Sequence, residues 1–362
     1  MESTKSLPPI SGRGAAANPR PTRTGSLDRE PDGDWLDIAE LIDGAPPPLR
    51  TTVTVEHPKT IIARNTSPDI GFDRSINPYR GCEHGCIYCY ARPTHAFHDL
   101  SPGLDFESRL FAKPDAAKLL RAELAKRGYT AAPLAIGTNT DGYQPIEREW
   151  GITRSVIEVL AEAKHPLLIT TKSDRLLRDI DLLAAMARDN LVGVAISVTT
   201  LDPGLARTLE PRAPHPKRRL AAIRQLIDAG VPMQVNISPI IPAITDHEIE
   251  AIMTAAAQAG AIRASYILMR LPYEVAPLFR AWLAAHYPDR ADKVMHLVQD
   301  IRGGRDNDPS FFARMKGHGV WAQLIRTRVK RAAHGHGMDK SFPPLRSDLF
   351  RPPAHDGQME LF

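Results

Sequence analysis

Between residues 134 and 271 the chain alternates short apolar runs with amphipathic stretches, and no other feature constrains its fold as strongly. The apolar runs are short and bounded by turn formers, so they predict strands at Leu134–Thr138, Leu167–Thr171, Val192–Thr199, Met233–Ile240 and Tyr266–Leu271. The stretches between them predict helices at Thr153–Ala163, Leu176–Ala187, Lys217–Ala229 and Asp246–Ala259. Together with a further strand before Cys82, these repeats predict an α/β fold, a parallel sheet with helices outside it.

The two ends of the chain differ in composition from this α/β region. Residues 1–50 mix Pro, Gly, Ser and Arg without apolar periodicity, which predicts a largely disordered segment. Within it, the amphipathic stretch Trp35–Ile42 is compatible with one docking helix. We expect the core to span residues 51–273, a basic helical extension to span 274–333, and a flexible tail to span 334–362.

Composition indicates a cytoplasmic globular protein. Hydrophobic residues make up 43% of the chain and charged residues 24%, as in ordinary soluble domains. No run approaches the ~20 apolar residues that a membrane helix needs, and the N-terminus lacks the apolar region of a signal peptide. The net charge of +4 is too small to indicate nucleic-acid binding by itself.

All three cysteines lie close together, in a C-x3-C-x2-C pattern formed by Cys82, Cys86 and Cys89. A closed iron–sulfur site takes four thiolates, so a four-iron cluster here leaves one iron open to a substrate. A disulfide is disfavoured because the cysteine count is odd and no secretory context is evident. Structural zinc is an alternative, although no second C-x2-C or H-x3-H pair is present; its fourth ligand would be His84, His95 or His98.

The segment Gly81–Tyr90 resembles the cluster loop of the radical S-adenosylmethionine (SAM) superfamily. Its flanks, Asn77–Cys82 and Tyr90–Arg92, further resemble the branch related to spore photoproduct lyase, and the likeness extends from about residue 74 to about residue 272. The resemblance implies a TIM-like partial (β/α)6 barrel with a [4Fe-4S] cluster on the three cysteines. It also implies that the amino and carboxylate groups of SAM chelate the fourth iron, with Tyr88 packed beside the adenine.

Polar residues follow the predicted strands at their carboxyl ends, where parallel barrels gather functional groups. In the superfamily these positions contact the amino, carboxylate and ribose groups of SAM. A compact ammonium suits the carboxylate, so Lys172 is the predicted contact there. The other predicted contacts are Thr138, Asn139, Thr140, Ser197 and Asn236, with Glu210 and Arg212 as further candidates. For each of these residues the alternative is a structural role in a turn or a helix cap. In addition, Gly137-Thr138-Asn139 stands where the superfamily commonly has a Gly-Gly-Glu pattern.

The resemblance also implies the reaction: reductive cleavage of SAM yields a 5′-deoxyadenosyl radical, which removes a hydrogen atom from the substrate. Nothing in the chain resembles a flavin site or a second cluster site, so we expect an external low-potential electron donor. Spore photoproduct lyase uses an additional cysteine as hydrogen donor, and this chain has none to spare. Tyr143 and Tyr266 are candidates for a relay in its place, with a buried structural tyrosine as the alternative.

Two features near the C-terminus point towards DNA. Between Arg302 and Arg351 there are eleven basic and four acidic residues, a bias that suits a phosphate backbone or, alternatively, a solvated helix face. The last five residues resemble the bacterial sliding-clamp-binding motif, with contacts at Gln358, Leu361 and Phe362; the alternative is that they fold back on the core.

These features predict a radical SAM enzyme that acts on DNA or a nucleotide, in DNA repair. One alternative keeps the enzyme and changes the substrate to RNA, a peptide or a small metabolite. The other is a non-catalytic zinc or iron–sulfur protein that recruits partners through its C-terminal tail. No catalytic residue beyond the cofactor ligands is predicted.

Overall fold

The computed structural model describes residues 10–23 and 49–353 of the chain. Its main sheet has seven strands in the order β10-β9-β8-β7-β6-β3-β2. Six are parallel neighbours: β3 (Arg74–Ile76), β6 (Leu134–Ile136), β7 (Leu167–Thr171), β8 (Val192–Ser197), β9 (Met233–Ile240) and β10 (Arg263–Leu268). β2 (Ile62–Arg64) pairs antiparallel with β3 at one edge. The α/β prediction is confirmed; β2 and β10 do not pair, so the sheet is open and the partial barrel stays a prediction.

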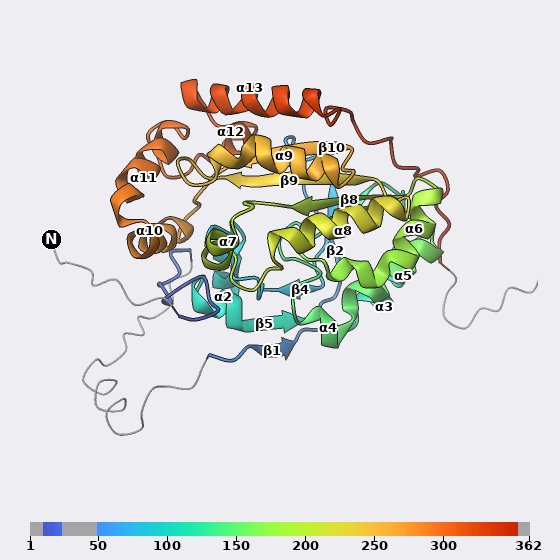
Figure 1. Cartoon of the computed structure of the whole chain (residues 1–362). Coiled ribbons are helices and arrows are strands. Elements are labelled where there is room, and N and C mark those ends of the chain that lie inside the picture. Colours follow the sequence, from blue (N-terminus) through green and yellow to red (C-terminus); the bar gives the residue numbers. More distant parts are fainter. Residues whose placement is uncertain (1–9, 24–48, 354–362) are drawn as a thin grey trace, which may run out of the picture.

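The helices that follow the strands lie where the amphipathic pattern predicts them. They are α5 (Ile152–Glu162), α6 (Ile180–Arg188), α8 (Pro216–Asp228) and α9 (Ile249–Gln258). Short helices occur before and between them: α3 (Ala116–Leu124), α4 (Glu147–Trp150), η2 (Arg175–Asp179), α7 (Pro203–Leu209) and η3 (Asp246–Glu248). Figure 1 shows α8 and α9 lying alongside β8 and β9. None of the helices in the described part of the chain has both the length and the apolar character that a membrane crossing demands.

One face of the sheet is apolar and the other carries polar side chains. On β9, Met233, Val235 and Ile237 are at most 1% exposed, because they pack under the helices. Gln234 and Asn236 alternate with them and are partly exposed on the opposite side of the strand. We call this second side the polar face.

A smaller sheet leads into the cysteine loop. It consists of β1 (Thr52–Val55), β5 (Arg109–Ala112) and β4 (Tyr79–Arg80), and the loop is followed by η1 (Arg92–His98) and α2 (Leu104–Ser108). Residues 10–23, part of the segment predicted to be largely disordered, pack against this region: Leu104 N donates to Ala17 O at 3.2 Å. The predicted docking helix at 35–42 lies outside the described residues.

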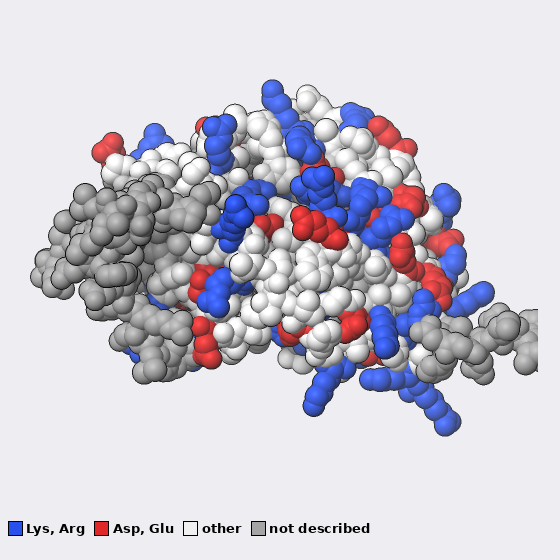
Figure 2. Space-filling view, turned by 90° about the horizontal axis from the view of Figure 1, so that it is seen from below, with Lys and Arg blue, Asp and Glu red and all other residues white. Residues whose placement is uncertain are grey.

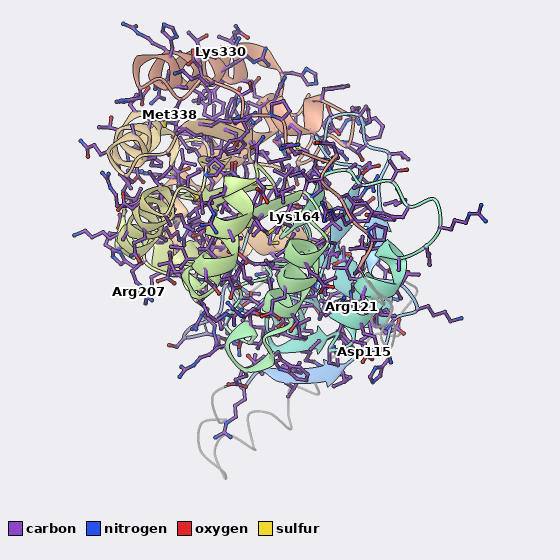
Figure 3. The ribbon with its side chains drawn as sticks, turned by 90° about the vertical axis from the view of Figure 1, so that its right-hand side faces the viewer. Asp115, Arg121, Lys164, Arg207, Lys330 and Met338 are labelled. Atoms are coloured by element: carbon purple, nitrogen blue, oxygen red, sulfur yellow. The ribbon has the colours of Figure 1, made fainter. Side chains whose placement is uncertain are left out.

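The C-terminal extension consists of α10 (Val275–His286), η4 (Pro288–Arg290), α11 (Ala291–Asp300), α12 (Ala313–Lys316) and α13 (Gly319–Gly335). Residues 338–351 then cross the end of the sheet where the strands begin, an end that faces the viewer in Figure 3. Ala264 N donates to Met338 O (3.1 Å) and Arg351 N donates to Ala163 O (2.9 Å). This part of the predicted flexible tail is therefore packed against the core, whereas residues 354–362 are outside the described part.

Candidate active site

The cysteine loop follows β4 and folds as two tight turns. Gly85 N donates to Cys82 O (3.3 Å), and Cys89 N donates to Cys86 O (3.1 Å). Gly81 has φ = +72°, and a Cβ there would lie 2.6 Å from a leucine side chain of β5, so the position requires glycine. Cys82 and Cys86 are each 7% exposed, and Cys89 is partly exposed. The three thiols thus share one short loop of defined geometry.

A buried arginine holds this loop in place. The Arg92 guanidinium is 0% exposed and donates to the carbonyls of Gly85 (3.1 Å) and Cys86 (2.9 Å). It also pairs with Glu107, whose side chain is equally buried. Glu107 accepts two further hydrogen bonds of 2.9 Å from the backbone N–H groups of residues 14 and 15. The N-terminal segment is thereby fixed against the cysteine loop.

On one side of the loop, Asp141 connects it to the end of β7. The Asp141 carboxylate accepts hydrogen bonds from Lys172 N (2.8 Å) and the Thr171 hydroxyl (2.7 Å), and lies 3.4 Å from His84 Nδ1. Burial acts to raise the pKa of Asp141, but His84 and these hydrogen bonds lower it to about 2. The carboxylate is therefore ionised near neutral pH.

On the other side, Tyr88 is tied to a buried acidic residue. Its hydroxyl donates to the carboxylate of Glu210, which also accepts from the Thr199 hydroxyl (2.7 Å) and pairs with Arg219. Burial acts to raise the pKa of Glu210, but the charges of Arg219 and Lys172 hold it at about 2. The orientation of the Tyr88 ring is fixed by this network.

Lys172 connects the Asp141 side of the loop with the Tyr88 side: its backbone N–H donates to Asp141, and its side chain extends towards Tyr88. Its ammonium nitrogen is 5.7 Å from the centre of the Tyr88 ring. Burial acts to lower the pKa of Lys172, but Cys86 and Glu210 more than offset it, so the pKa lies above its ordinary value. The structure thus brings a charged ammonium, predicted as the carboxylate contact, beside the cysteine loop.

The loop after β6 carries three more of the predicted residues. Gly137 has φ = +86°, and a Cβ there would overlap a backbone carbonyl of β7. Asn139 N and Thr140 N both donate to the side-chain oxygen of Asn77, at 3.2 and 3.4 Å. The Thr140 hydroxyl is buried and donates to a carbonyl of β4 (2.9 Å), so it already has a protein partner. Thr138 and Asn139 are partly exposed, and their contacts with SAM stay predictions.

Ser197, the last residue of β8, pairs in register with Asn236 in the middle of β9. The side-chain oxygen of Asn236 accepts hydrogen bonds from Gln234 (2.5 Å) and from the Ser265 hydroxyl of β10 (2.6 Å). Further along β9, the buried hydroxyl oxygen of Ser238 has no hydrogen-bond partner in the described part of the chain. An unsatisfied polar atom of this kind suits a ligand.

These residues fit an iron–sulfur cluster with SAM better than a zinc ion. Within residues 10–23 and 49–353, no three His, Cys, Asp or Glu side chains converge as the ligands of one metal ion do. A cluster differs because its thiolates bind separate irons. Burial raises the pKa of the Cys82 thiol, and that of Cys86 to about 12, so a bound metal has to displace their protons. Arg212 pairs with Glu83 (3.1 Å) beside the loop.

Fold and site together define an α/β protein with an iron–sulfur type of cysteine loop at the carboxyl edge of a parallel sheet. The sequence model of the radical SAM superfamily matches residues 76–256. The chain therefore belongs to the radical SAM superfamily, a membership that implies an iron–sulfur cluster and SAM as cofactors.

The comparisons with individual proteins agree with this assignment. The chain is 36% identical over 230 residues to the uncharacterized protein Rv2578c of Mycobacterium tuberculosis, covering 63% of this chain and 68% of that protein. It is 29% identical over 173 residues to the uncharacterized protein MJ0683 of Methanocaldococcus jannaschii, covering 48% and 62%. Among solved structures, spore photoproduct lyase matches with a TM-score of 0.56 at 17% identity over 79% of both chains. That last likeness concerns the fold alone.

Proposed function

We propose that this protein is a radical SAM enzyme that uses a [4Fe-4S] cluster on Cys82, Cys86 and Cys89 to abstract a hydrogen atom from DNA or a nucleotide. The proposal is supported chiefly by the position of Lys172 and Tyr88 at the cysteine loop. When bound and reduced by an external donor, the cluster and SAM supply a 5′-deoxyadenosyl radical.

In this proposal the chain's own residues bind and orient the cofactors. Arg92 keeps the cysteine loop in shape, because it fixes two of the loop's carbonyls. The Lys172 ammonium binds the carboxylate of SAM. Tyr88 packs against the adenine, and its hydrogen bond to Glu210 sets the plane of the ring. The polar ends of β8 and β9 provide donors and acceptors for the ribose hydroxyls.

The proposed substrate class rests on the fold that this chain shares with spore photoproduct lyase. Spore photoproduct lyase, whose fold this chain shares, has been solved in complex with a dinucleoside spore photoproduct. This chain has no fourth cysteine to return a hydrogen atom in that enzyme's way, so we propose a different reaction on a related class of substrate.

The basic segment 302–351 gives weaker support than its composition suggests. Arg302 is 1% exposed and donates to Met269 O (3.0 Å), so it is a core residue rather than a phosphate contact. Arg328 pairs with Glu250 at 2.6 Å. The burial of Arg302 and the ion pair of Arg328 count against phosphate contacts at these two positions. Figure 2 displays the side of the molecule opposite to α13, and acidic side chains lie beside many of the basic ones on that face too.

A location in the cytoplasm and binding of a sliding clamp through Gln358, Leu361 and Phe362 belong to the same proposal. The three clamp contacts lie outside the described residues. They would place the enzyme at replicating or repaired DNA.

Anaerobic reconstitution with iron and sulfide tests the proposed function. We expect a brown protein with ~4 irons per chain that forms 5′-deoxyadenosine from SAM when reduced. Cys86→Ala should lose both properties. Lys172→Met should keep the irons and raise the KM for SAM about tenfold or more, whereas Lys164→Met, at a side chain that is 48% exposed, serves as the matched control. A colourless protein that binds one zinc and forms no deoxyadenosine would contradict the proposal.

A further inference from the structure

Five exposed aromatic side chains lie on segments that surround the cysteine loop and the end of β10. Tyr90 is 44% exposed, Phe97 67%, Tyr273 55%, Phe311 53% and Phe312 56%. Within the described residues, every Phe, Tyr or Trp side chain that is exposed belongs to this group, which we call the aromatic rim. Their restriction to one region of the molecule is unlike the scattered apolar residues of an ordinary surface.

Arginine side chains lie over the rings of the rim. The Arg270 guanidinium carbon is 4.4 Å from the centre of the Tyr90 ring. That of Arg23 is 4.1 Å from the Tyr273 ring and 5.7 Å from the Phe97 ring. The rim therefore presents flat apolar faces next to positive charges, a combination that suits an anionic ligand with aromatic groups.

The segment that carries the last two rings is held in a strained conformation. Arg314 lies 5.0 Å from the Phe311 ring and binds Asp69 through two hydrogen bonds of 2.5 and 2.7 Å. Asp69, whose side chain is 1% exposed, also accepts a hydrogen bond from Phe312 N (2.9 Å). Phe312 has φ = +65°, which is unfavourable for any residue with a Cβ. Strain of this kind persists where the surrounding contacts enforce it, often at binding sites.

The rim is continuous with the candidate active site. Tyr90 directly follows Cys89, and its hydroxyl donates to the carbonyl of Thr138. α12, which carries Arg314, packs against β10, the strand that ends two residues before Arg270. A ligand that lies across the rim would therefore lie beside the cysteine loop.

We propose that the aromatic rim binds unpaired nucleobases by stacking, so that this enzyme acts on a single strand or on a nucleotide held out of a duplex. Aromatic rings stack on any base, and neighbouring arginines bind the phosphates. A duplex hides the faces of its bases, and a base inside it cannot approach an active site. The guanidinium groups over the rings favour a nucleic acid, which carries many negative charges, over an apolar peptide. The inference rests on the proposed function, because it names the form in which a nucleic-acid substrate is recognised.

Fluorescence anisotropy with the full-length protein tests this inference. The probes are a labelled 12-nucleotide oligothymidine and a labelled duplex of equal length. We expect the single strand to bind at least tenfold more tightly than the duplex at equal salt. Tyr273→Leu and Phe311→Leu, which keep an apolar side chain and remove the ring, should each weaken single-strand binding about tenfold. Phe311→Tyr should bind like the wild type, as should Val320→Ala, at an aliphatic side chain that is 87% exposed on α13.

Equal affinity for both probes, or unchanged single-strand binding in both leucine variants, would overturn the inference. Preferential binding of a peptide that competes with the oligonucleotide would assign the rim to another class of ligand and overturn it as well. In the wild-type protein, normal deoxyadenosine formation from SAM without single-strand binding refutes the rim alone. Single-strand binding by a protein that cannot cleave SAM refutes the proposed function instead.

Discussion

Replacing Glu210 by glutamine should destabilise the protein strongly although the two side chains have nearly the same shape. Glu210 is 1% exposed, and its carboxylate pairs with Arg219, which is also 1% exposed. Tyr88 and Thr199 donate to the same carboxylate. Glu210→Gln removes the negative charge and leaves the guanidinium of Arg219 buried without compensation.

The pKa of Glu210 sets the size of the effect. The pKa falls from 4.5 to about 2, because Arg219 and Lys172 outweigh the opposing effect of burial. At about 1.4 kcal/mol per pKa unit, the ionised carboxylate contributes about 3 kcal/mol to the free energy of unfolding. Since the folded pKa is depressed, this contribution is complete above about pH 4.5 and is lost as the pH falls towards 2. Breaking a buried ion pair typically costs a similar ~3–5 kcal/mol.

Urea unfolding followed by tryptophan fluorescence, under reducing conditions at pH 7, measures this loss. Glu162→Gln is the matched control, because Glu162 pairs with Arg121 through a side chain that is 48% exposed, and its loss should cost less than about 1 kcal/mol. The Glu210→Gln penalty should also shrink below pH 4. If the two variants lost the same small amount of stability, or if the Glu210 penalty did not depend on pH, the buried pair would not have the role described.

Three further predictions concern an arginine and a glycine that support the site and a buried histidine at the other end of the sheet. Arg92→Lys should lower both the free energy of unfolding, by ~1–3 kcal/mol, and the iron content per chain, because one ammonium nitrogen cannot reach the four carbonyls and the Glu107 carboxylate that the three guanidinium nitrogens bind. Gly137→Ala should cost over ~3 kcal/mol of unfolding free energy, because its Cβ overlaps a β7 carbonyl; Gly151→Ala, with positive φ but open space, should cost only ~1 kcal/mol. Burial lowers the pKa of His165 from 6.5 to about 4, so up to ~3 kcal/mol of stability should be lost as the pH falls through that range, and His165→Gln should flatten urea midpoints measured across it.

The fold could be predicted where the apolar pattern is strong and less well where polar residues form strands. β7 and β9 have the predicted bounds, because in each strand buried residues alternate with partly exposed ones. β10 starts at Arg263, before the predicted Tyr266, because Arg263 and Ser265 interrupt the apolar pattern yet pair in register with β9. A strand segment with polar residues is stabilised by pairing with the neighbouring strand, and the local sequence pattern does not reveal that pairing.

For the site as well, local sequence features could be predicted and contacts between distant residues could not. Cysteine spacing predicted the loop, and the position after β7 predicted Lys172, because both are local properties of the sequence. Glu107 and Arg219 were missed as buried partners of the loop and of Glu210. A charged residue is ordinarily expected at the surface, and its burial depends on a partner distant in the sequence. Arg92 was noticed only through the resemblance of its segment to a family.

Strand parity decides whether Tyr266 can act as a relay, and burial decides the same question for Tyr143. Tyr266 pairs in register with Ile237, so it lies on the apolar face, whereas Ser265 beside it bonds to Asn236 on the polar face at 2.6 Å. Turning Tyr266 to the polar face would require β10 to slip by one residue, which would break that bond. Tyr143 is 0% exposed, and its hydroxyl donates to a buried aspartate.

We therefore expect Tyr266→Phe and Tyr143→Phe to leave deoxyadenosine formation and substrate turnover unchanged. The second variant should still lower the free energy of unfolding by ~1–3 kcal/mol, because Asp179 loses the hydroxyl that donates to it at 3.0 Å. The two readouts separate a structural tyrosine from a redox-active one: a structural role changes the urea midpoint alone. A relay would instead reduce turnover while leaving the midpoint in place, and such a result at Tyr266 would show that β10 presents its other face to the substrate.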